Sequence, residues 1–260
     1  MIDVQGTLID DREKKPIAGA LEAVSSLKEE GVPFLLVTNN TKLKSEAFRS
    51  YLRSLGFRFD DAQYLDPLMV LENVLPPCKT AAYGTDAFLE LLQARGYRLE
   101  YQRPDAVLVS IKEDFNNAEF AEMIEALLAG ARLVGMHETS LYAKNGRRYP
   151  GVGAILKMLS FATGKEYTVV GKPSRSFYDE ALRRLRQQED SLENGQIVMI
   201  SDDLIGDLKG AKEMGIRTAL VLSGKIASVQ EAMEAAKRVK PEWISHDIGE
   251  WFQSNKRGAA

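Results

Sequence analysis

The chain opens with Met1-Ile2-Asp3-Val4-Gln5-Gly6-Thr7-Leu8, and the predicted fold is organised around this stretch. The apolar residues before Asp3 indicate a short buried strand, and the Gly-Thr pair after it indicates a tight turn. Ligands of parallel sheets bind beyond the carboxyl ends of the strands. The stretch is typical of a strand that presents a carboxylate to a site, although by itself it also fits an Asp and a Gly in an ordinary turn.

Strand-like and helical patterns alternate along the next residues. Phe34-Leu35-Leu36-Val37 is a continuous apolar run, which is typical of a strand buried on both faces. Helical periodicity precedes it, ending near Gly31, and two further helices are expected up to Gly56 and from Asp66 to Leu75. This βαβα order predicts an α/β fold with a parallel sheet and right-handed crossovers.

The chain has a predicted domain boundary at Pro76-Pro77. Residues 79–164 have their own alternation of strand-like and helical patterns, with strands near 80–83, 106–109 and 132–134 and a loop from 135 to 149. A segment of this length can bury its own core. The alternation of strands and helices seen in the first 78 residues then resumes, beginning with a strand at 167–170. We therefore expect a core domain formed by residues 1–78 and 165–260, with an inserted domain at 79–164.

Composition excludes several classes of partner. The 260 residues are 45% hydrophobic and 27% charged, an ordinary globular balance. The formal net charge of −3 gives no reason to expect nucleic acid as a partner. No apolar run approaches the ~20 residues of a membrane helix, and acidic residues interrupt the N-terminus, so no signal peptide is expected. The single cysteine, Cys78, fits a reducing cytoplasm.

Four apolar runs end in polar residues of complementary chemistry: Asp3, then Thr38-Asn39, then Lys172, then Asp202 with Asp207 nearby. Parallel strands bring such ends to one edge of a sheet. Carboxylates suit Mg²⁺, while a hydroxyl, a backbone N–H and an ammonium suit the oxygens of a phosphoryl group. An Asp at such a site can attack phosphorus, and Mg²⁺ reduces the repulsion between two anions.

Each motif also has a plain structural explanation. A lysine such as Lys172 is usually a surface residue, and Thr38-Asn39 is a common turn sequence. Asp202-Asp203 is a suitable helix N-cap. The order and spacing of the four motifs together favour a site.

The same stretches resemble the haloacid dehalogenase superfamily. The inserted domain resembles the cap of its NagD-like (class IIA) branch, which includes nitrophenyl-phosphate, phosphoglycolate and pyridoxal-phosphate phosphatases. The resemblance covers nearly the whole chain and implies a Rossmann-like three-layer core with a C2-type α/β cap. The matching stretches are Asp3-Val4-Gln5-Gly6-Thr7-Leu8, Val37-Thr38-Asn39-Asn40, Val170-Gly171-Lys172-Pro173-Ser174, Ser201-Asp202-Asp203 through Asp207, Pro104-Asp105-Ala106-Val107 and Pro150-Gly151-Val152-Gly153.

The resemblance implies a Mg²⁺-dependent phosphatase acting on a small phosphorylated metabolite, and a homodimer through the cap. Asp3 would be the nucleophile and a metal ligand, with the Gln5 carbonyl and Asp202 as further ligands. Asp207 would hold a metal-bound water or orient Lys172. The remaining implied roles are phosphoryl binding by Thr38 and the Asn39 N–H, and charge neutralisation by Lys172.

Gln5 departs from the family pattern, which usually has a second Asp there to protonate the leaving group and activate water. A carboxamide donates hydrogen bonds but does not exchange a proton at neutral pH. Losing a general acid/base typically costs ~10²–10⁴-fold in rate. We therefore expect a slow phosphatase that works best on acidic leaving groups. Two smaller departures are Ser201, where Gly is common, and the two residues that precede Asp3.

Two alternatives remain beside this interpretation. The first is a phosphate-binding or regulatory protein of the same fold that no longer turns over. The second is a receiver domain, which is disfavoured because the chain is too long and the acidic pair comes late. Substrate selection is assigned to the inserted domain near Met136-His137-Glu138-Thr139 and Tyr142, with His137, Arg147 and Arg148 expected to be solvated.

Overall fold

The computed structural model describes residues 1–144, 147–225 and 239–256. The chain divides into two compact units. The first consists of Met1–Thr38, Glu46–Leu65 and Tyr178–Ala260, and the second of Asn39–Ser45 and Asp66–Phe177. Each unit is an α/β structure around a parallel sheet, which confirms the predicted fold class. None of the helices in the described part of the chain has the length and apolar character needed to cross a membrane.

The sheet of the first unit has the order β13-β12-β11-β1-β2-β3, and all its neighbouring strands are parallel. In chain order within this sheet the arrangement is 3-2-1-4-5-6, the Rossmann order, with the direction of winding reversed between β1 and β11. The strands are β1 Ile2–Asp3, β2 Leu36–Val37, β3 Tyr64–Leu65, β11 Val198–Ser201, β12 Arg217–Val221 and β13 Trp243–Ser245.

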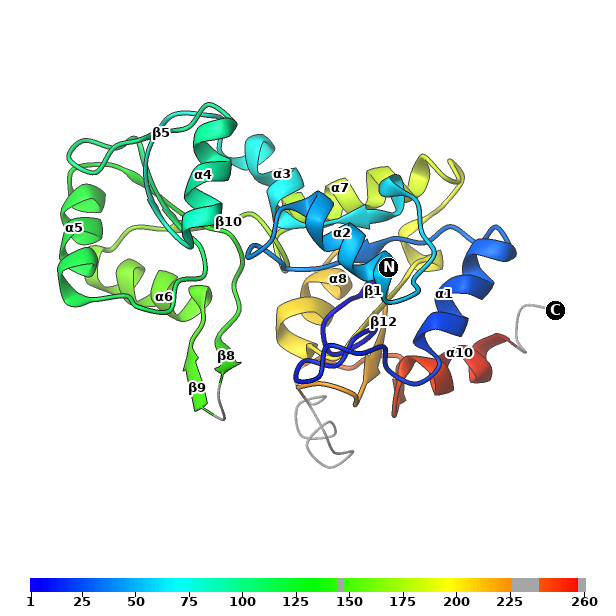
Figure 1. Ribbon diagram of the computed structural model, residues 1–260. Helices are drawn as coiled ribbons and strands as arrows, with labels where there is room; N and C mark the ends of the chain where they lie inside the picture. The colour runs from blue at the N-terminus through cyan, green and yellow to red at the C-terminus, as the bar shows by residue number, and fades with distance from the viewer. Residues whose placement is uncertain (145–146, 226–238, 257–260) are drawn as a thin grey trace. The chain divides into compact units, whose positions relative to one another are not determined.

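Burial explains why these strands read as continuous apolar runs. Leu36 and Val37 in β2, and Leu220 and Val221 in β12, are all fully buried although successive side chains point to opposite faces. Among the helices, α10 packs beside α1 (Figure 1). The helices of this unit are α1 Ala20–Glu29, α2 Ser45–Ser54, α8 Lys209–Glu213 and α10 Ile248–Lys256, with a π-helical turn at Leu204–Leu208; α7 Arg175–Arg186 begins in the second unit.

The second unit contains a five-stranded parallel sheet of order β10-β7-β6-β4-β5. In chain order this is 2-1-3-4-5, the flavodoxin-like doubly wound order. The strands are β4 Lys79–Tyr83, β5 Arg98–Leu99, β6 Ala106–Val109, β7 Arg132–Gly135 and β10 Tyr167–Val169. The helices are α3 Pro67–Val74, α4 Asp86–Ala94, α5 Asn117–Leu128 and α6 Val152–Thr163.

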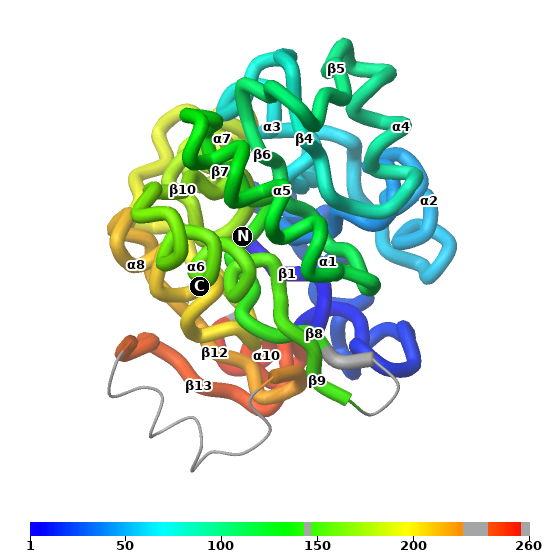
Figure 2. Tube along the Cα trace, turned by 90° about the vertical axis from the view of Figure 1, so that its left-hand side faces the viewer, coloured from blue at the N-terminus to red at the C-terminus, as the bar shows by residue number. Residues whose placement is uncertain are grey.

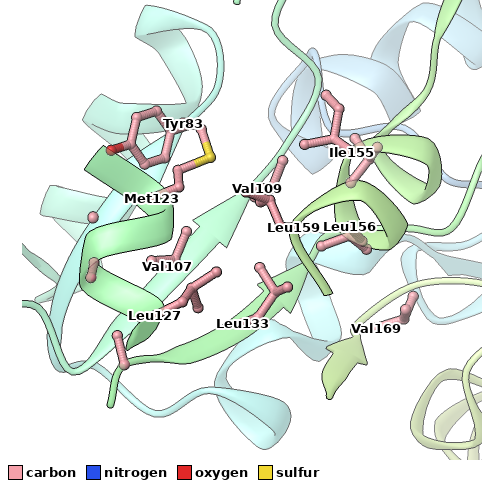
Figure 3. Close-up of a cluster of buried hydrophobic side chains, with 14 residues drawn as sticks. Tyr83, Val107, Val109, Met123, Leu127, Leu133, Ile155, Leu156, Leu159 and Val169 are labelled. Atoms are coloured by element: carbon pink, nitrogen blue, oxygen red, sulfur yellow. The ribbon is translucent and has the colours of Figure 1, made fainter. Parts of the chain in front are cut away.

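The core of the second unit lies between its sheet and two helices (Figure 3). Val107 and Leu133 come from the sheet, Leu127 comes from α5, and Leu156 and Leu159 come from α6. All five are at least 98% buried. Burying side chains of this size stabilises a domain by roughly 1.5–3 kcal/mol each, so this cluster holds the second unit together independently of any site chemistry.

Two segments differ from expectation. Tyr167–Val169 pairs with β7 in the second sheet, whereas we expected residues 165–260 to join the first. Apolar pattern identifies a strand but not its partner. Residues 135–149 contain an antiparallel hairpin of β8 Leu141–Lys144 and β9 Arg147–Pro150 rather than a loop (Figures 1 and 2). The two strands pair Tyr142 with Tyr149, a cross-strand contact that a loop would not make.

Candidate active site

The carboxyl edge of the first sheet carries most of the predicted site residues. Asp3 ends β1, whose two neighbours in the sheet are β2 and β11. Thr38 follows β2, and Asp202 follows β11. Because winding reverses between β1 and β11, this edge contains the switch point at which doubly wound sheets bind ligands. The first unit thus gathers Asp3, Thr38 and Asp202 where its topology favours a ligand.

The acidic side chains at this edge are buried. Asp3, Asp202 and Asp207 are 5%, 1% and 3% exposed. A buried carboxylate is unfavourable unless it is hydrogen-bonded, paired with a cation or bound to a metal. Hydrogen bonds meet part of this requirement, and a bound cation would offset the remaining cost of burying these charges.

Gly6 shapes the turn after β1. Its φ of +81° lies in the left-handed region, and a Cβ there would lie 2.3 Å from Asp202 Oδ2. Glycine meets both requirements because it has no Cβ. On either side of this contact, the Asp202 N–H donates to Thr7 Oγ1 at 3.2 Å, and Ser223 Oγ donates to the Gly6 carbonyl at 2.7 Å. These contacts thus fix the turn after β1 against the end of β11.

The Asp202 carboxylate is held by the loop after β12. The backbone N–H of Lys225 donates to Asp202 Oδ2 at 2.8 Å. Burial raises the pKa of the Asp202 carboxyl to about 7; Lys225 opposes the shift, and the negative charges of Asp203 and Asp207 add to it. Without a bound cation, the site therefore holds a carboxylate whose charged form is strongly disfavoured.

Asp207 is fixed by neighbours on both sides. Ser201 Oγ donates to Asp207 Oδ2 at 2.6 Å, and the Tyr178 hydroxyl donates to the backbone carbonyl of Asp207 at 2.6 Å. Burial raises the pKa of the Tyr178 hydroxyl well above its usual value. The negative charges of Asp207, Asp3 and Asp203 raise it further.

Gln5 interacts with the predicted phosphate-binding hydroxyl. Thr38 Oγ1 donates to Gln5 Oε1 at 2.6 Å. Thr38 is fully buried, and Gln5 is half-buried. The carboxamide therefore lies beside the hydroxyl rather than pointing to solvent. It contributes an acceptor and two N–H donors, but no exchangeable acid.

Asn39 and Lys172 lie in the second unit and are joined there. Asn39 Nδ2 donates to the Lys172 carbonyl at 3.2 Å, and the Lys172 N–H donates to Asn39 Oδ1 at 2.9 Å. Lys172 is 2% exposed, so it is not a surface lysine. The structure thus brings the predicted residues together in two sets, of which the first comprises Asp3, Gln5, Thr38, Asp202 and Asp207 and the second comprises Asn39 and Lys172.

The oxygen-rich first set fits a hard divalent cation. In the described part of the chain, no three His, Cys, Asp or Glu side chains are grouped as a ready-made metal cage. Mg²⁺ needs fewer, because it is usually bound by one or two carboxylates together with waters and substrate phosphate oxygens. The desolvated carboxylate of Asp202 is the observation that fits such an ion, since a cation would offset the burial of its charge.

The structure adds residues that we did not identify from the sequence. Lys225 and Ser223 follow β12, whose carboxyl end lies at the same edge of the sheet, and the signal for them in the sequence is the polar stretch Ser223-Gly224-Lys225 after an apolar run. Tyr178 lies next to the predicted helical stripe of Phe177, Ala181, Leu182 and Leu185, and nothing in the sequence marks its hydroxyl. In the second unit, His137 is 5% exposed, so our expectation of a solvated loop residue was wrong, whereas Arg147 and Arg148 are exposed as expected.

Two family models match this chain, one in its N-terminal part and one in its C-terminal part. Residues 1–98 match the model of the haloacid dehalogenase-like hydrolases, and residues 169–251 match a model described as HAD-hydrolase-like. The human haloacid dehalogenase-like hydrolase domain-containing protein 2 is 29% identical over 97% of this chain and 95% of its own.

Solved structures give the same result for the fold. The p-nitrophenyl phosphatase of Archaeoglobus fulgidus has a TM-score of 0.84 at 24% identity, over 98% of this chain and 97% of its own. NagD of E. coli has a TM-score of 0.76 at 22% identity, over 96% of each chain. The glycerol phosphate phosphatase of Mycobacterium tuberculosis has a TM-score of 0.76 at 27% identity, over 96% of this chain and 73% of its own; it was solved with calcium, and separately with magnesium. The chain belongs to the haloacid dehalogenase superfamily of hydrolases.

Proposed function

We propose that this protein is a Mg²⁺-dependent phosphatase that hydrolyses a small phosphorylated metabolite through an aspartyl phosphate on Asp3. The observation that carries the proposal is the burial of Asp3, Asp202 and Asp207 in the first unit, with Asp3 at the end of β1 and Asp202 directly after β11, the two strands that flank the switch point. Buried acids at this place are expected for a site that binds a metal and a phosphoryl group. Relatives named as phosphatases act on compounds of this class, glycerol phosphate among them.

The chain's own groups have distinct proposed roles. An Asp3 carboxylate oxygen forms a bond to phosphorus while the bond to the ester oxygen breaks, and water then releases phosphate and restores Asp3. Thr38 and the Asn39 N–H bind phosphoryl oxygens, and Lys172 neutralises their charge. Asp3, the Gln5 carbonyl and Asp202 would hold Mg²⁺, with Asp207 orienting a water or Lys172. The ion would supply Lewis acidity and reduce the repulsion between Asp3 and the phosphate.

Gln5 limits the rate in this scheme. Its Oε1 already accepts from Thr38, and its carboxamide neither protonates a leaving group nor deprotonates water. Aryl phosphates have acidic leaving groups and need little protonation, whereas alkyl phosphates depend on it. The proposed enzyme is therefore slow, and slowest on alkyl esters.

Replacing Gln5 by Asp tests this limit. We predict that Gln5→Asp raises kcat/KM on an alkyl phosphate by ~10²-fold or more, and on an aryl phosphate by much less, because kcat/KM reports phosphoryl transfer to Asp3 and only the alkyl leaving group needs a proton in that step. Gln5→Asn is the matched control, since it stays a carboxamide. An equal gain on both esters, or none, contradicts the assigned role of Gln5.

The proposed activity itself is tested with a panel of phosphorylated metabolites and Mg²⁺. The parent protein should release phosphate from at least one member, and Asp3→Asn should release none. Phosphate release that survives in Asp3→Asn would refute Asp3 as the nucleophile.

The second candidate is a phosphate-binding or regulatory protein of the same fold, and Gln5 is the observation that favours it. Such a protein would bind a phosphate mimic such as orthovanadate in a Mg²⁺-dependent way, as the enzyme does. The panel separates the two candidates, because the binding protein shows no phosphate release that depends on Asp3.

The second unit has a proposed role in substrate selection. Because the family resemblance extends through residues 79–164, we propose that this segment is the cap, and that its closure excludes water during phosphoryl transfer. The same resemblance supports a homodimer through the cap. We also propose a cytoplasmic location, because the lone Cys78 suits a reducing compartment.

A further inference from the structure

Lys225 places a positive charge next to the proposed metal site. Its ammonium forms an ion pair with the carboxylate of Asp203, and its backbone N–H donates to Asp202. The lysine side chain is 45% exposed, and that of Asp203 is 19% exposed. Lys225 therefore contacts both members of the Asp202-Asp203 pair, one through the side chain and one through the main chain.

The charge of Lys225 acts on more than one acid. Burial alone would lower the pKa of the Lys225 ammonium, but the negative charges of Asp203, Asp202 and Asp207 raise it above its ordinary value. Lys225 in turn lowers the pKa of Asp202. The ammonium thus stabilises negative charge at the position where a metal ion would do the same.

We propose that Lys225 is a positioning residue that sets the metal affinity of this site, acting through Asp203 as a fixed cation that weakens divalent-ion binding. The proposal rests on the metal site of the proposed function. A fixed charge repels a divalent ion in proportion to the ion's charge, and the repulsion is only partly screened near a protein surface. The structural and electrostatic roles of Lys225 can be separated, because its backbone N–H persists whatever the side chain.

The chain provides matched variants. Lys225→Met removes the charge and keeps much of the length, whereas Lys225→Arg keeps the charge. Lys28 in α1 is a suitable control, because it also belongs to the first unit and forms an ion pair with an aspartate, Asp60. Its side chain is 34% exposed. Lys28→Met therefore removes a similar charge pair that makes no contact with Asp202 or Asp203.

The test is calorimetric titration of the metal-free proteins with MgCl₂ at pH 8, without substrate. We expect Lys225→Met to bind Mg²⁺ roughly three- to tenfold more tightly than the parent, and Lys225→Arg and Lys28→Met to match the parent. Raising the ionic strength from about 0.02 to 0.5 M should shrink the difference, because salt shortens the Debye length. Adding Asp203→Asn to Lys225→Met should bring the affinity back towards that of the parent.

The contrary results are distinct. Unchanged or weaker Mg²⁺ binding by Lys225→Met overturns the role of Lys225 while leaving the proposed function intact. Tighter binding by Lys28→Met to the same extent also overturns it, because the effect would then be one of net charge. A parent protein that binds no Mg²⁺ overturns both this inference and the metal site on which it rests.

Discussion

The two sheets share a doubly wound parallel design but fill their switch points differently. In the first sheet, the strands at the switch point lead to Asp3 and Asp202, and the glycine turn at Gly6 leaves room for a carboxylate. In the second sheet the corresponding strands are β4 and β6, and a Cβ on Gly84 would lie 2.5 Å from the ring of Phe88 and 3.2 Å from Ser110 Cβ. The comparison shows that topology supplies the place for a site, while the residues decide whether acids or an aromatic ring occupy it.

The buried polar residues that follow the strands also differ between the two sheets. Those of the first sheet include Asp202 and Asp207, whereas those after β6, β7 and β10 in the second are Ser110, His137 and Lys172. Buried acids reduce stability unless a cation is present, but buried leucines increase it. Truncating a buried leucine of the second unit should therefore destabilise the protein, whereas neutralising a buried acid of the first unit should stabilise the metal-free protein.

The largest effect is expected in the apolar core of the second unit. Leu156→Ala should lower the free energy of unfolding by about 2–5 kcal/mol, because it removes a fully buried side chain and leaves a cavity. Leu128→Ala is the control, since Leu128 is 56% exposed, and it should change stability little. Denaturation followed by circular dichroism measures both. Similar losses in the two variants would mean that the cluster in Figure 3 is not the stabilising core.

A substitution at Asp202 is expected to raise the free energy of unfolding of the metal-free protein, the reverse of the effect at Leu156. The pKa of this carboxyl is raised by burial, so the folded protein retains a proton that the unfolded chain loses. The unfolding free energy of the metal-free parent should thus fall as pH rises from about 4 through about 7. Asp202→Asn should remove this dependence and stabilise the metal-free protein by on the order of 2 kcal/mol at pH 8.

Tryptophan fluorescence suits the Asp202→Asn measurement, because both tryptophans, Trp243 and Trp251, belong to the first unit. The variant should also lose any stabilisation by Mg²⁺. If it is less stable than the parent at pH 8 in metal-free buffer, the carboxylate is not held under a burial penalty.

The smallest effect on stability is expected from replacing one buried serine by alanine at the carboxyl edge of each sheet. Ser201 Oγ donates to a buried carboxylate at 2.6 Å, whereas Ser110 Oγ donates to the hydroxyl of Thr41 at 3.2 Å. Both serines are fully buried. Hydrogen bonds to charged groups contribute more, so Ser201→Ala should destabilise by about 1 kcal/mol more than Ser110→Ala. Equal losses in chemical denaturation would show that the hydrogen bond to Asp207 contributes no more than the one to Thr41.

Several elements were predictable because their signals are local. The Asp66-Pro67 pair predicted the start of α3, where the Met69 N–H donates to Asp66 Oδ1 at 3.2 Å. The apolar runs before Asp3, Thr38 and Asp202 predicted strands that end at one edge of the first sheet. In each case the residues that decide the structure are adjacent in sequence.

The missed features depend on partners that are distant in sequence. The pairing of Tyr167–Val169 with β7 bridges more than thirty residues, and the contact between Thr38 and Gln5 depends on how β1 and β2 align. The role of Lys225 depends on a side chain more than twenty residues away, in Asp203. Periodicity and motif spacing contain no information on such pairings, so only the folded chain reveals them.

The most direct test of the account is to locate the phosphoryl group during turnover. Parent protein mixed with Mg²⁺ and an aryl phosphate is quenched in acid, digested and analysed by mass spectrometry. Because Gln5 does not activate water, the intermediate should accumulate, and the phosphoryl group should lie on the peptide that contains Asp3 and be lost on treatment with hydroxylamine. A phosphoryl group on another residue would contradict the account. So would phosphate release without a trapped intermediate, if the Asp3→Asn variant also released phosphate at the parent's rate.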